Sequence, residues 1–384
     1  MPLLPILLLL LLVLTDVYLW MSYARGVCSL WGGVLYWLPL AVLMWGIGCF
    51  IVGAGSHMVL KITFLVFLCV ALPKIVFALF SLLGRLCALF VPNGDVMGLG
   101  CAVVVGSATF IMALYGFCWG WTRLVTKTET VSVAQLPAAF EGYRIVQISD
   151  LHLGTFGEDT EFVEQMVAQI NELDADAVVF TGDLVSIAPE ELAPFQAELK
   201  KISARDGVFS ILGNHDYCTY HPDKSVGGRK QRLQELMSMQ RAMGWRLLMN
   251  EHVVVRRGAD SLVIAGVENV ARPPFPSHGD LKKALSGVSE EAYVVLLSHD
   301  PTHWRREVLA QHPNVCLTLS GHTHAMQFRL GNFSPSKWIY DEWGGHYEEQ
   351  GQHLMVSTGA GSNIPFRFGA WPEMVEVELR RREL

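Results

Sequence analysis

The sequence predicts an α/β domain that follows an all-α region of transmembrane helices. Two observations support this prediction. Residues 1–121 hold almost no charge, although 17% of the 384 residues are charged. Beyond them, apolar strands alternate with amphipathic helices, and a polar cluster follows five of the strands. We therefore divide the chain into a transmembrane region (1–121), a linker and lead-in (122–142) and a soluble domain (143–384).

Four apolar segments in the first region are long enough to cross a membrane. At 1.5 Å per residue, each would span roughly 30 Å of hydrocarbon as a helix. Tryptophan and tyrosine residues gather near their ends, as they do at membrane interfaces. No basic residue precedes the first segment, which favours a retained helix; a cleaved signal peptide is the alternative. The predicted helices cover residues 2–20, 30–52, 59–83 and 97–120.

One charged residue lies well inside the third segment. Lys74 follows Pro73, and a charge at this depth is costly unless it is paired or reaches the membrane surface. The sequence favours a kinked helix with a lysine that extends to the surface. The alternative is a paired, functional lysine, for which Asp16 is the acidic candidate in the other spans.

Loop charges favour a cytoplasmic position for the soluble domain by one charge. Arg25 and Arg85 lie on one side of the predicted spans, and Lys61, Arg123 and Lys127 lie on the side of the soluble domain. Because basic loops tend to face the cytoplasm, three residues against two predict this orientation.

Composition excludes two classes of function. The net charge is −7 and there is no basic run, so we expect no binding to nucleic acid. The eight cysteines show no CxxC pair and no regular spacing, so we expect no disulfide framework. Twelve of the thirteen histidines follow residue 150, which points to chemistry in the C-terminal half.

Five predicted strands end in clusters of polar residues. A β-α-β-α-β pattern over residues 144–216 predicts three parallel, neighbouring strands whose C-terminal ends converge. Two later strands, 292–297 and 315–319, end in similar clusters. The clusters are Asp150-x-His152, Gly182-Asp183, Gly213-Asn214-His215-Asp216, His299 and Gly321-His322-Thr323-His324.

The chemistry of these clusters suits a pair of metal ions. Histidine nitrogens mixed with carboxylate and amide oxygens suit Zn, Mn or Fe better than Ca. Seven potential ligands are too many for one tetrahedral ion, and they suit two ions bridged by a carboxylate. Two metal ions about 3.5–4 Å apart are a common device for the hydrolysis of phosphate esters.

The five clusters together resemble the calcineurin-like metallophosphoesterase superfamily, whose pattern is DxH, GD, GNH[D/E], H and GHxH. The resemblance covers residues 143–379, and the stretch 357–373 resembles the bacterial branch with membrane-associated phosphodiesterases. It implies a two-sheet metallophosphoesterase sandwich flanked by helices, in the bacterial cell (inner) membrane. It also implies hydrolysis of a phosphodiester, phosphomonoester or pyrophosphate bond by attack of a metal-bridging hydroxide.

The resemblance also assigns roles to individual residues. His215 would be the catalytic residue that faces the substrate, with Asp216 orienting it. Arg367 would either contact the substrate phosphate or form a structural ion pair. The family often continues its last block with Gly-Gly-Gln, and residues 325–327 depart from this, which alters the pocket rim. The implied metal ligands are Asp150, His152 and His324 for the first ion, Asn214, His299 and His322 for the second, and Asp183 as the bridge.

The membrane region bears on the substrate. A catalytic domain held at the lipid bilayer suggests a lipid-linked phosphate ester. One alternative is a phosphodiesterase of soluble nucleotides with the helices as an anchor only. Another is a membrane sensor or transporter with a regulatory phosphoesterase domain. The expected cofactors are two divalent metal ions, for which the nitrogen and oxygen ligands accept Mn, Fe or Zn.

Overall fold

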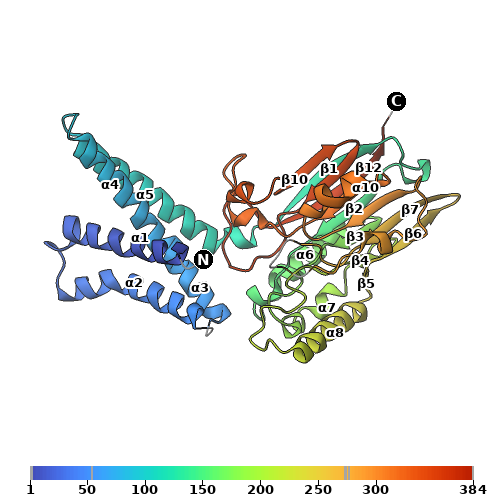
Figure 1. Cartoon of the computed structure of the whole chain (residues 1–384), viewed down its shortest axis with the longest axis horizontal. Helices are drawn as coiled ribbons and strands as arrows, with labels where there is room; N and C mark the ends of the chain where they lie inside the picture. Colours follow the sequence, from blue (N-terminus) through green and yellow to red (C-terminus); the bar gives the residue numbers. More distant parts are fainter. Residues whose placement is uncertain (1–2, 53–54, 272–274, 276, 383–384) are drawn as a thin grey trace. The chain divides into compact units, whose positions relative to one another are not determined.

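The computed structural model describes residues 3–52, 55–271, 275 and 277–382 (Figure 1). The outer ends of the predicted regions, residues 1–2 and 383–384, lie outside the described residues. The chain forms two compact units, which separate between Trp119 and Gly120. The first is helical and the second contains the β-sheets.

Among the described residues of the first unit, four helices are long and apolar enough to cross a membrane. They cover Ile6–Ala24, Leu30–Ile51, Met58–Cys87 and Gly94–Thr122, which confirms the four predicted spans. The individual elements are α1 (Leu3–Leu19) with the π-helical turn η1 (Trp20–Ala24), α2 (Leu30–Ile51), α3 (His57–Val66) with the π-helical turn η2 (Phe67–Ala71), α4 (Leu72–Cys87) and α5 (Gly94–Cys118).

The third span changes its helical geometry just before Pro73. Proline has no N–H and its ring clashes with the preceding turn, so the π-helical turn η2 is placed where such a distortion is expected. The sequence favoured a lysine that extends to the membrane surface, but Lys74 is paired instead. Its Nζ lies 2.7 Å from Asp16 Oδ1, so the paired alternative is the one that the structure shows.

The second unit contains two six-stranded mixed sheets. Their strand orders are β1-β12-β2-β3-β4-β5 and β10-β11-β9-β8-β7-β6. The first sheet consists of β1 (Val125–Val133), β12 (Glu373–Arg381), β2 (Tyr143–Ile148), β3 (Ala177–Phe180), β4 (Val208–Ser210) and β5 (Arg246–Leu247). The second consists of β10 (Gly345–Glu349), β11 (Gln352–Val356), β9 (Val315–Ser320), β8 (Tyr293–Leu297), β7 (Asp260–Gly266) and β6 (Glu251–Arg257).

Apolar side chains hold the two sheets face to face. Ile145 and Val179 from the first sheet and Val295 and Leu317 from the second belong to one buried cluster. Helices cover the outer faces through two further clusters, so the predicted two-sheet sandwich flanked by helices is confirmed. The main helices of this unit are α6 (Glu161–Glu172), α7 (Gln196–Leu199), α8 (Val226–Ala242), α9 (Leu281–Ala284) and α10 (Leu309–Gln311), with π-helical turn η7 (Trp304–Val308) before α10.

The strand order brings the polar clusters together. Strands β2, β3 and β4 are parallel neighbours in the first sheet. Strands β8 and β9 are parallel neighbours in the second sheet. Because parallel neighbours end at the same edge of a sheet, each sheet presents its polar clusters side by side.

The segment expected as a linker contains a strand. Strand β1 pairs in parallel with β12 along its whole length, from Val125 opposite Glu373 to Val133 opposite Arg381. Its run of threonines and charges resembled a polar connection because most of this edge strand is only half-buried or exposed. We therefore propose that the soluble domain begins before β1 and that residues 122–142 belong to it.

Candidate metal centre

The five polar strand ends converge on one site between the two sheets. Three groups of donors each place their ligand atoms within 4.8 Å of one another. His152 and Asp183 each belong to two groups, so the three groups form one continuous cluster. The groups are Asp150, His152 and His324; His152, Asp183 and His215; and Asp183, His299 and His322.

At the first end of the cluster, two ring nitrogens and a carboxylate oxygen lie close enough together to hold one cation. His152 Nε2 lies 3.0 Å from His324 Nε2. His324 Nε2 in turn lies 3.4 Å from Asp150 Oδ1. Two imidazole nitrogens and a carboxylate oxygen at these separations match the donors of a divalent transition-metal site.

The second end of the cluster holds the remaining predicted ligands. His299 Nε2 lies 3.2 Å from His322 Nδ1 and 3.2 Å from Asn214 Oδ1. Asp183 Oδ2 lies 3.2 Å from His299 Nε2 and 3.7 Å from His152 Nε2. Asp183 therefore sits between the two ends, where one carboxylate can reach both.

Hydrogen bonds on the far side of the rings fix which nitrogen faces the cluster. His299 Nδ1 donates to the carbonyl oxygen of Thr181 at 2.8 Å, which leaves Nε2 for a metal ion. The Tyr340 hydroxyl lies 2.9 Å from His322 Nε2, which leaves Nδ1. Such outer partners orient metal-binding histidines and raise their basicity.

Five site residues adopt left-handed backbone conformations. This region is uncommon for residues other than glycine, and each such residue costs of the order of 1–3 kcal/mol. The surrounding sheets hold these conformations, which turn the side chains back towards the cluster. The φ angles are 54° at Asp150, 46° at His152, 60° at Asp183, 75° at His322 and 50° at His324.

Glycines in two motifs allow carboxylates to approach the backbone. A Cβ atom at Gly213 would overlap the Asp183 carboxylate. A Cβ atom at Gly321 would likewise overlap the Asp150 carboxylate. Any side chain at either position would displace one of these two acidic ligands, so the glycines are needed for close approach.

Asp216 does not orient His215, contrary to the expectation from the sequence. Its carboxylate accepts four backbone N–H bonds, from Asp183 (2.8 Å), Leu184 (2.9 Å), Val185 (3.2 Å) and Gly213 (2.9 Å). Burial and the neighbouring Asp183 carboxylate raise the pKa of Asp216 to about 7, and the N–H donors of Gly213 and Val185 oppose this rise. Asp216 therefore ties the loop after β4 to the loop after β3.

A backbone carbonyl orients His215 instead. His215 Nδ1 donates to the carbonyl oxygen of Ser186 at 2.7 Å, and the ring stacks on Tyr220 with centroids 4.4 Å apart. Its backbone N–H donates to Asp183 Oδ1 at 2.8 Å. The half-buried ring meets His152 edge-on, with centroids 4.7 Å apart. Because Nδ1 is occupied, Nε2 is the nitrogen left for a substrate.

Burial sets the protonation states of the ligands. It lowers the pKa values of His152 and His324 well below their usual range, and that of His322 to about 4. These rings are therefore neutral at neutral pH, as metal binding requires. Burial also opposes a proton on His299, but the carboxylates of Asp183 and Asp150 raise its pKa to about 10. A cation bound beside those carboxylates would replace that proton.

Arg367 is enclosed behind the cluster. Its side chain is completely buried, and it donates to the carbonyl oxygens of Thr358 (2.7 Å), Gly361 (2.6 Å) and Ala370 (2.8 Å). Its Nη2 also lies 3.1 Å from His324 Nδ1. Arg367 therefore supports His324 and the loop after β11, which fits neither a contact with substrate nor the ion pair expected from the sequence.

Sequence reasoning missed several neighbours of the site. Ser186 acts through its backbone carbonyl, which leaves no signal in its residue type. Tyr220 lies five residues after the His215 motif, and Phe275 packs edge-on against His322 with centroids 5.3 Å apart. Tyr340 lies in an aromatic-rich loop after the last motif, but its hydrogen bond to a predicted ligand depends on how that loop folds.

The donor set fits a pair of divalent metal ions. The donors are nitrogens and oxygens, most of them are buried, and three of the four histidines among the predicted ligands are neutral at neutral pH. All seven predicted ligands and His215 lie within this cluster.

Comparisons with known proteins agree with this chemistry. Residues 143–326 match the family model described as calcineurin-like phosphoesterase. The chain is 30% identical over 266 residues to the uncharacterized metallophosphoesterase YkuE of Bacillus subtilis, which covers 66% of this chain and 85% of YkuE. The chain therefore belongs to the calcineurin-like metallophosphoesterase family, as predicted, and this family uses a dinuclear metal centre.

Two further relatives contribute to the comparison. One is a zebrafish (Danio rerio) transmembrane protein with metallophosphoesterase domain, 30% identical over 283 residues and covering 71% of this chain. The chain spans 61% of the length of that relative. The other is the UDP-2,3-diacylglucosamine pyrophosphatase LpxG of Chlamydia trachomatis, 26% identical over 330 residues and covering 71% of this chain and 95% of LpxG. The four apolar helices and the likeness to the zebrafish transmembrane protein support a membrane protein.

Proposed function

We propose that the protein is a membrane-anchored phosphoesterase that works with two divalent ions held between its two sheets. The observation that supports this most directly is the position of Asp183, which is shared by two donor groups and can bridge two ions. The first ion would be held by Asp150, His152 and His324, and the second by Asn214, His299 and His322, with Mn, Fe or Zn as the suitable metals.

The chain's own residues divide the work of hydrolysis. When bound, the two ions would activate a water molecule and withdraw charge from the phosphoryl oxygens. His215 would donate a hydrogen bond or a proton to the phosphoryl or leaving-group oxygen through Nε2, because Ser186 holds Nδ1. Tyr220 would keep the ring in place by stacking.

A lipid-linked phosphodiester or pyrophosphate is the substrate class that we propose. The apolar helices tether the catalytic unit to a bilayer. LpxG, which aligns over 95% of its length, is named for a pyrophosphate substrate that has two acyl chains. The soluble-nucleotide alternative requires no tether.

Site-directed variants test the chemistry. Purified full-length protein with Mn²⁺ should hydrolyse bis(p-nitrophenyl) phosphate, and Asp183→Ala should abolish this activity. His215→Ala should lower kcat by about 10²–10⁴-fold, the usual contribution of a general acid. His346→Ala removes an exposed histidine of β10 and should retain the wild-type rate. Unchanged activity in Asp183→Ala would refute the proposed metal centre.

Competition between substrates tests the substrate class. The full-length protein is assayed on detergent-dispersed lipid pyrophosphates and on soluble nucleotide phosphodiesters. We expect a higher kcat/KM for the lipid substrates. A higher value for the nucleotides would instead support a nucleotide phosphodiesterase with an anchor.

We further propose that the protein resides in a bacterial inner membrane with its catalytic unit in the cytoplasm. The balance of basic residues outside the spans supports this orientation. A C-terminal green fluorescent protein fusion should fluoresce, and a C-terminal alkaline phosphatase fusion should be inactive. The opposite pattern would place the catalytic unit on the other side.

A further inference from the structure

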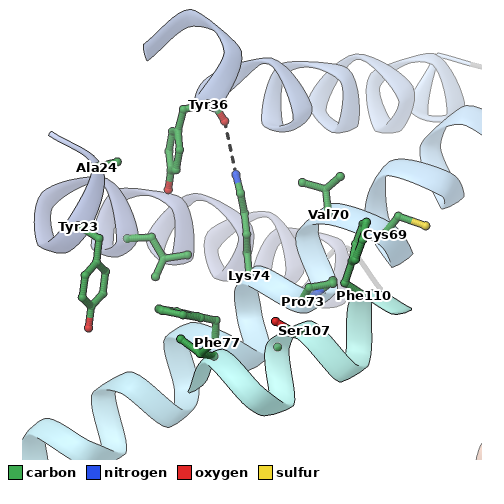
Figure 2. A pocket seen from close by; sticks show the side chains of 13 residues that line it. Tyr23, Ala24, Tyr36, Cys69, Val70, Pro73, Lys74, Phe77, Ser107 and Phe110 are labelled. Atoms are coloured by element: carbon green, nitrogen blue, oxygen red, sulfur yellow. Dashed lines mark hydrogen bonds between the residues drawn. The ribbon is translucent and has the colours of Figure 1, made fainter. Parts of the chain in front are cut away.

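Exposed apolar side chains gather on one loop of the catalytic unit. In the membrane unit such side chains, and the apolar cavity beside Lys74 (Figure 2), follow from the lipid that surrounds transmembrane helices. In a catalytic unit they mark an interaction surface when they cluster. Three of those in the described part of this unit are scattered, at Tyr220, Val226 and Val254. The others all lie on residues 326–339, the apolar loop: Met326, Leu330, Phe333, Trp338 and Ile339.

The apolar loop is held firmly in place. Leu330 and Phe333 exchange two backbone hydrogen bonds, of 2.9 and 3.1 Å, across a two-residue turn at the tip. The Phe333 ring meets Trp338 edge-on, with centroids 5.5 Å apart. On the inner side, the buried Ser334 hydroxyl donates to the carbonyl oxygen of Ala325 at 2.6 Å. The loop therefore displays its apolar side chains in a fixed arrangement, so a partner that covers them has little ordering entropy to overcome.

The loop that precedes β12 marks the end of the catalytic unit at which the chain arrives from its last span. That span ends at Thr122, and β1 begins three residues later, which is at most about 11 Å of extended chain. Between them, the Arg123 guanidinium lies 5.0 Å from the centre of the Trp371 ring. A Cβ atom at Gly120 would overlap the carbonyl oxygen of Arg367. The chain therefore enters the catalytic unit against residues 367–371.

The apolar loop lies against the same residues. The Trp371 ring packs against Phe368 with centroids 5.9 Å apart. Phe368 in turn stacks on Phe328, with centroids 6.0 Å apart, and its carbonyl oxygen accepts the N–H of Arg329 at 2.8 Å. Leu330 is the next residue. Contacts within the catalytic unit thus connect the point where the chain enters from the membrane to the tip of the apolar loop.

The composition of the apolar loop suits the surface of a bilayer. Tryptophan and lysine are typical of this boundary, where an apolar body meets lipid tails and a polar end meets water, and Lys337 and Trp338 are adjacent and exposed. Residues 325–340 include Arg329 and Lys337 but no acidic residue, although the whole chain has a net charge of −7. Asp341 is the first acidic residue that follows. A basic, apolar surface matches a membrane that contains anionic lipids.

We propose that the apolar loop docks into the surface of the bilayer that holds the membrane unit, as a second attachment besides the helices. Its exposed side chains enter the boundary between head groups and acyl chains. The loop begins two residues after His324 and ends beside Tyr340, whose hydroxyl bonds His322. Docking therefore holds the metal centre beside the lipid head groups. Only the use of this position to reach a lipid-linked substrate rests on the proposed function.

Site-specific photo-crosslinking tests the docking. Full-length protein with p-benzoylphenylalanine in place of Trp338 is reconstituted into nanodiscs of phosphatidylethanolamine and phosphatidylglycerol, illuminated and examined by mass spectrometry. We expect phospholipid to be the main photoproduct. The same probe in place of Leu330 should give the same result, which keeps the test valid if the first variant folds poorly. The control carries the probe in place of Val226, which is 81% exposed on α8 and should label little lipid. Helix α8 packs beside β5, at the edge of the first sheet opposite β1.

A charge on the apolar loop tests whether its apolar character matters. With the probe at position 338, Ile339→Asp should lower lipid labelling by at least about fivefold, because a carboxylate loses the apolar contact and is repelled by anionic lipid. Val226→Asp should leave the labelling unchanged. Crosslinking requires no turnover, so its outcome is independent of the proposed reaction.

Three results would overturn the proposal. The first is lipid labelling from positions 338 and 330 that does not exceed labelling from position 226. The second is equal lipid labelling in Ile339→Asp and Val226→Asp. The third is a crosslink from the apolar loop to a second copy of the chain, or to the membrane helices, in place of lipid, because that would identify a different occupant of this surface.

Discussion

Asp216 offers the sharpest quantitative test of how the site is held together. Its carboxylate accepts N–H bonds from Asp183, Leu184, Val185 and Gly213 at 2.8–3.2 Å. In Asp216→Asn the shape is retained, but the amide has one carbonyl oxygen with two lone pairs and an NH₂ group that cannot accept. At least two of the four buried N–H groups therefore lose their partner.

The loss in free energy of unfolding follows from the number of buried N–H groups that are left without an acceptor. Each buried N–H without a partner costs about 1–3 kcal/mol, so two of them cost about 2–6 kcal/mol. For a domain of this size each kcal/mol shifts Tm by about 2–4 °C, which gives a fall of roughly 4–24 °C. Because the donors belong to the loops that position Asp183, we also expect weaker metal binding in Asp216→Asn.

Thermal unfolding and hydrogen exchange together provide the assay. Unfolding is followed with EDTA present by tryptophan fluorescence, for which Trp245, buried behind the first sheet, is a suitable reporter. The amides of Leu184 and Val185 should exchange faster in Asp216→Asn. Asp159→Asn is the control, because exposed Asp159 accepts one N–H bond that asparagine can still accept. An unchanged Tm, or a lower Tm without faster exchange at these amides, would refute the reasoning.

Three further predictions concern the ligands and their supports. Arg367→Lys should weaken Mn²⁺ binding by about 10–100-fold in a titration followed by electron paramagnetic resonance. The reason is that a lysine cannot reach three carbonyl oxygens and His324 together. Wild-type affinity for Mn²⁺ in this variant would contradict the supporting role of Arg367. Tyr340→Phe should weaken binding by about tenfold in the same titration, since His322 Nε2 loses its partner. In metal-free protein the pKa of His299 is raised to about 10, so the protonated ring stabilises the fold. This stabilisation is fully present at pH values below the usual histidine pKa of about 6.5, and it is lost as the pH rises through 10. We expect this loss of stability at alkaline pH to be absent from His299→Gln when Tm is measured against pH in EDTA. An identical profile in the variant would exclude the pairing of His299 with the Asp183 and Asp150 carboxylates.

The membrane unit shows how far composition can predict structure. Four spans follow from runs of apolar residues, since the energy of placing a segment in a bilayer depends mostly on its own side chains. Pro73 also indicated where the third span departs from a regular helix. From the sequence, the pairing of Lys74 with Asp16 was only an alternative, because this pairing joins residues 58 positions apart and depends on the packing of α1 against α4.

At the metal centre, too, some features follow from the sequence and others only from the folded structure. The sequence alone determined the family and the parallel strands, and it predicted a set of donor residues, because metal chemistry restricts ligand types and strand ends are local features. Only the tertiary structure decided that Asp216 holds the Asp183 loop, that Ser186 orients His215 and that Arg367 is buried. These roles depend on backbone N–H and carbonyl groups, which every residue has, so residue type cannot reveal them and only the packed fold selects the partners.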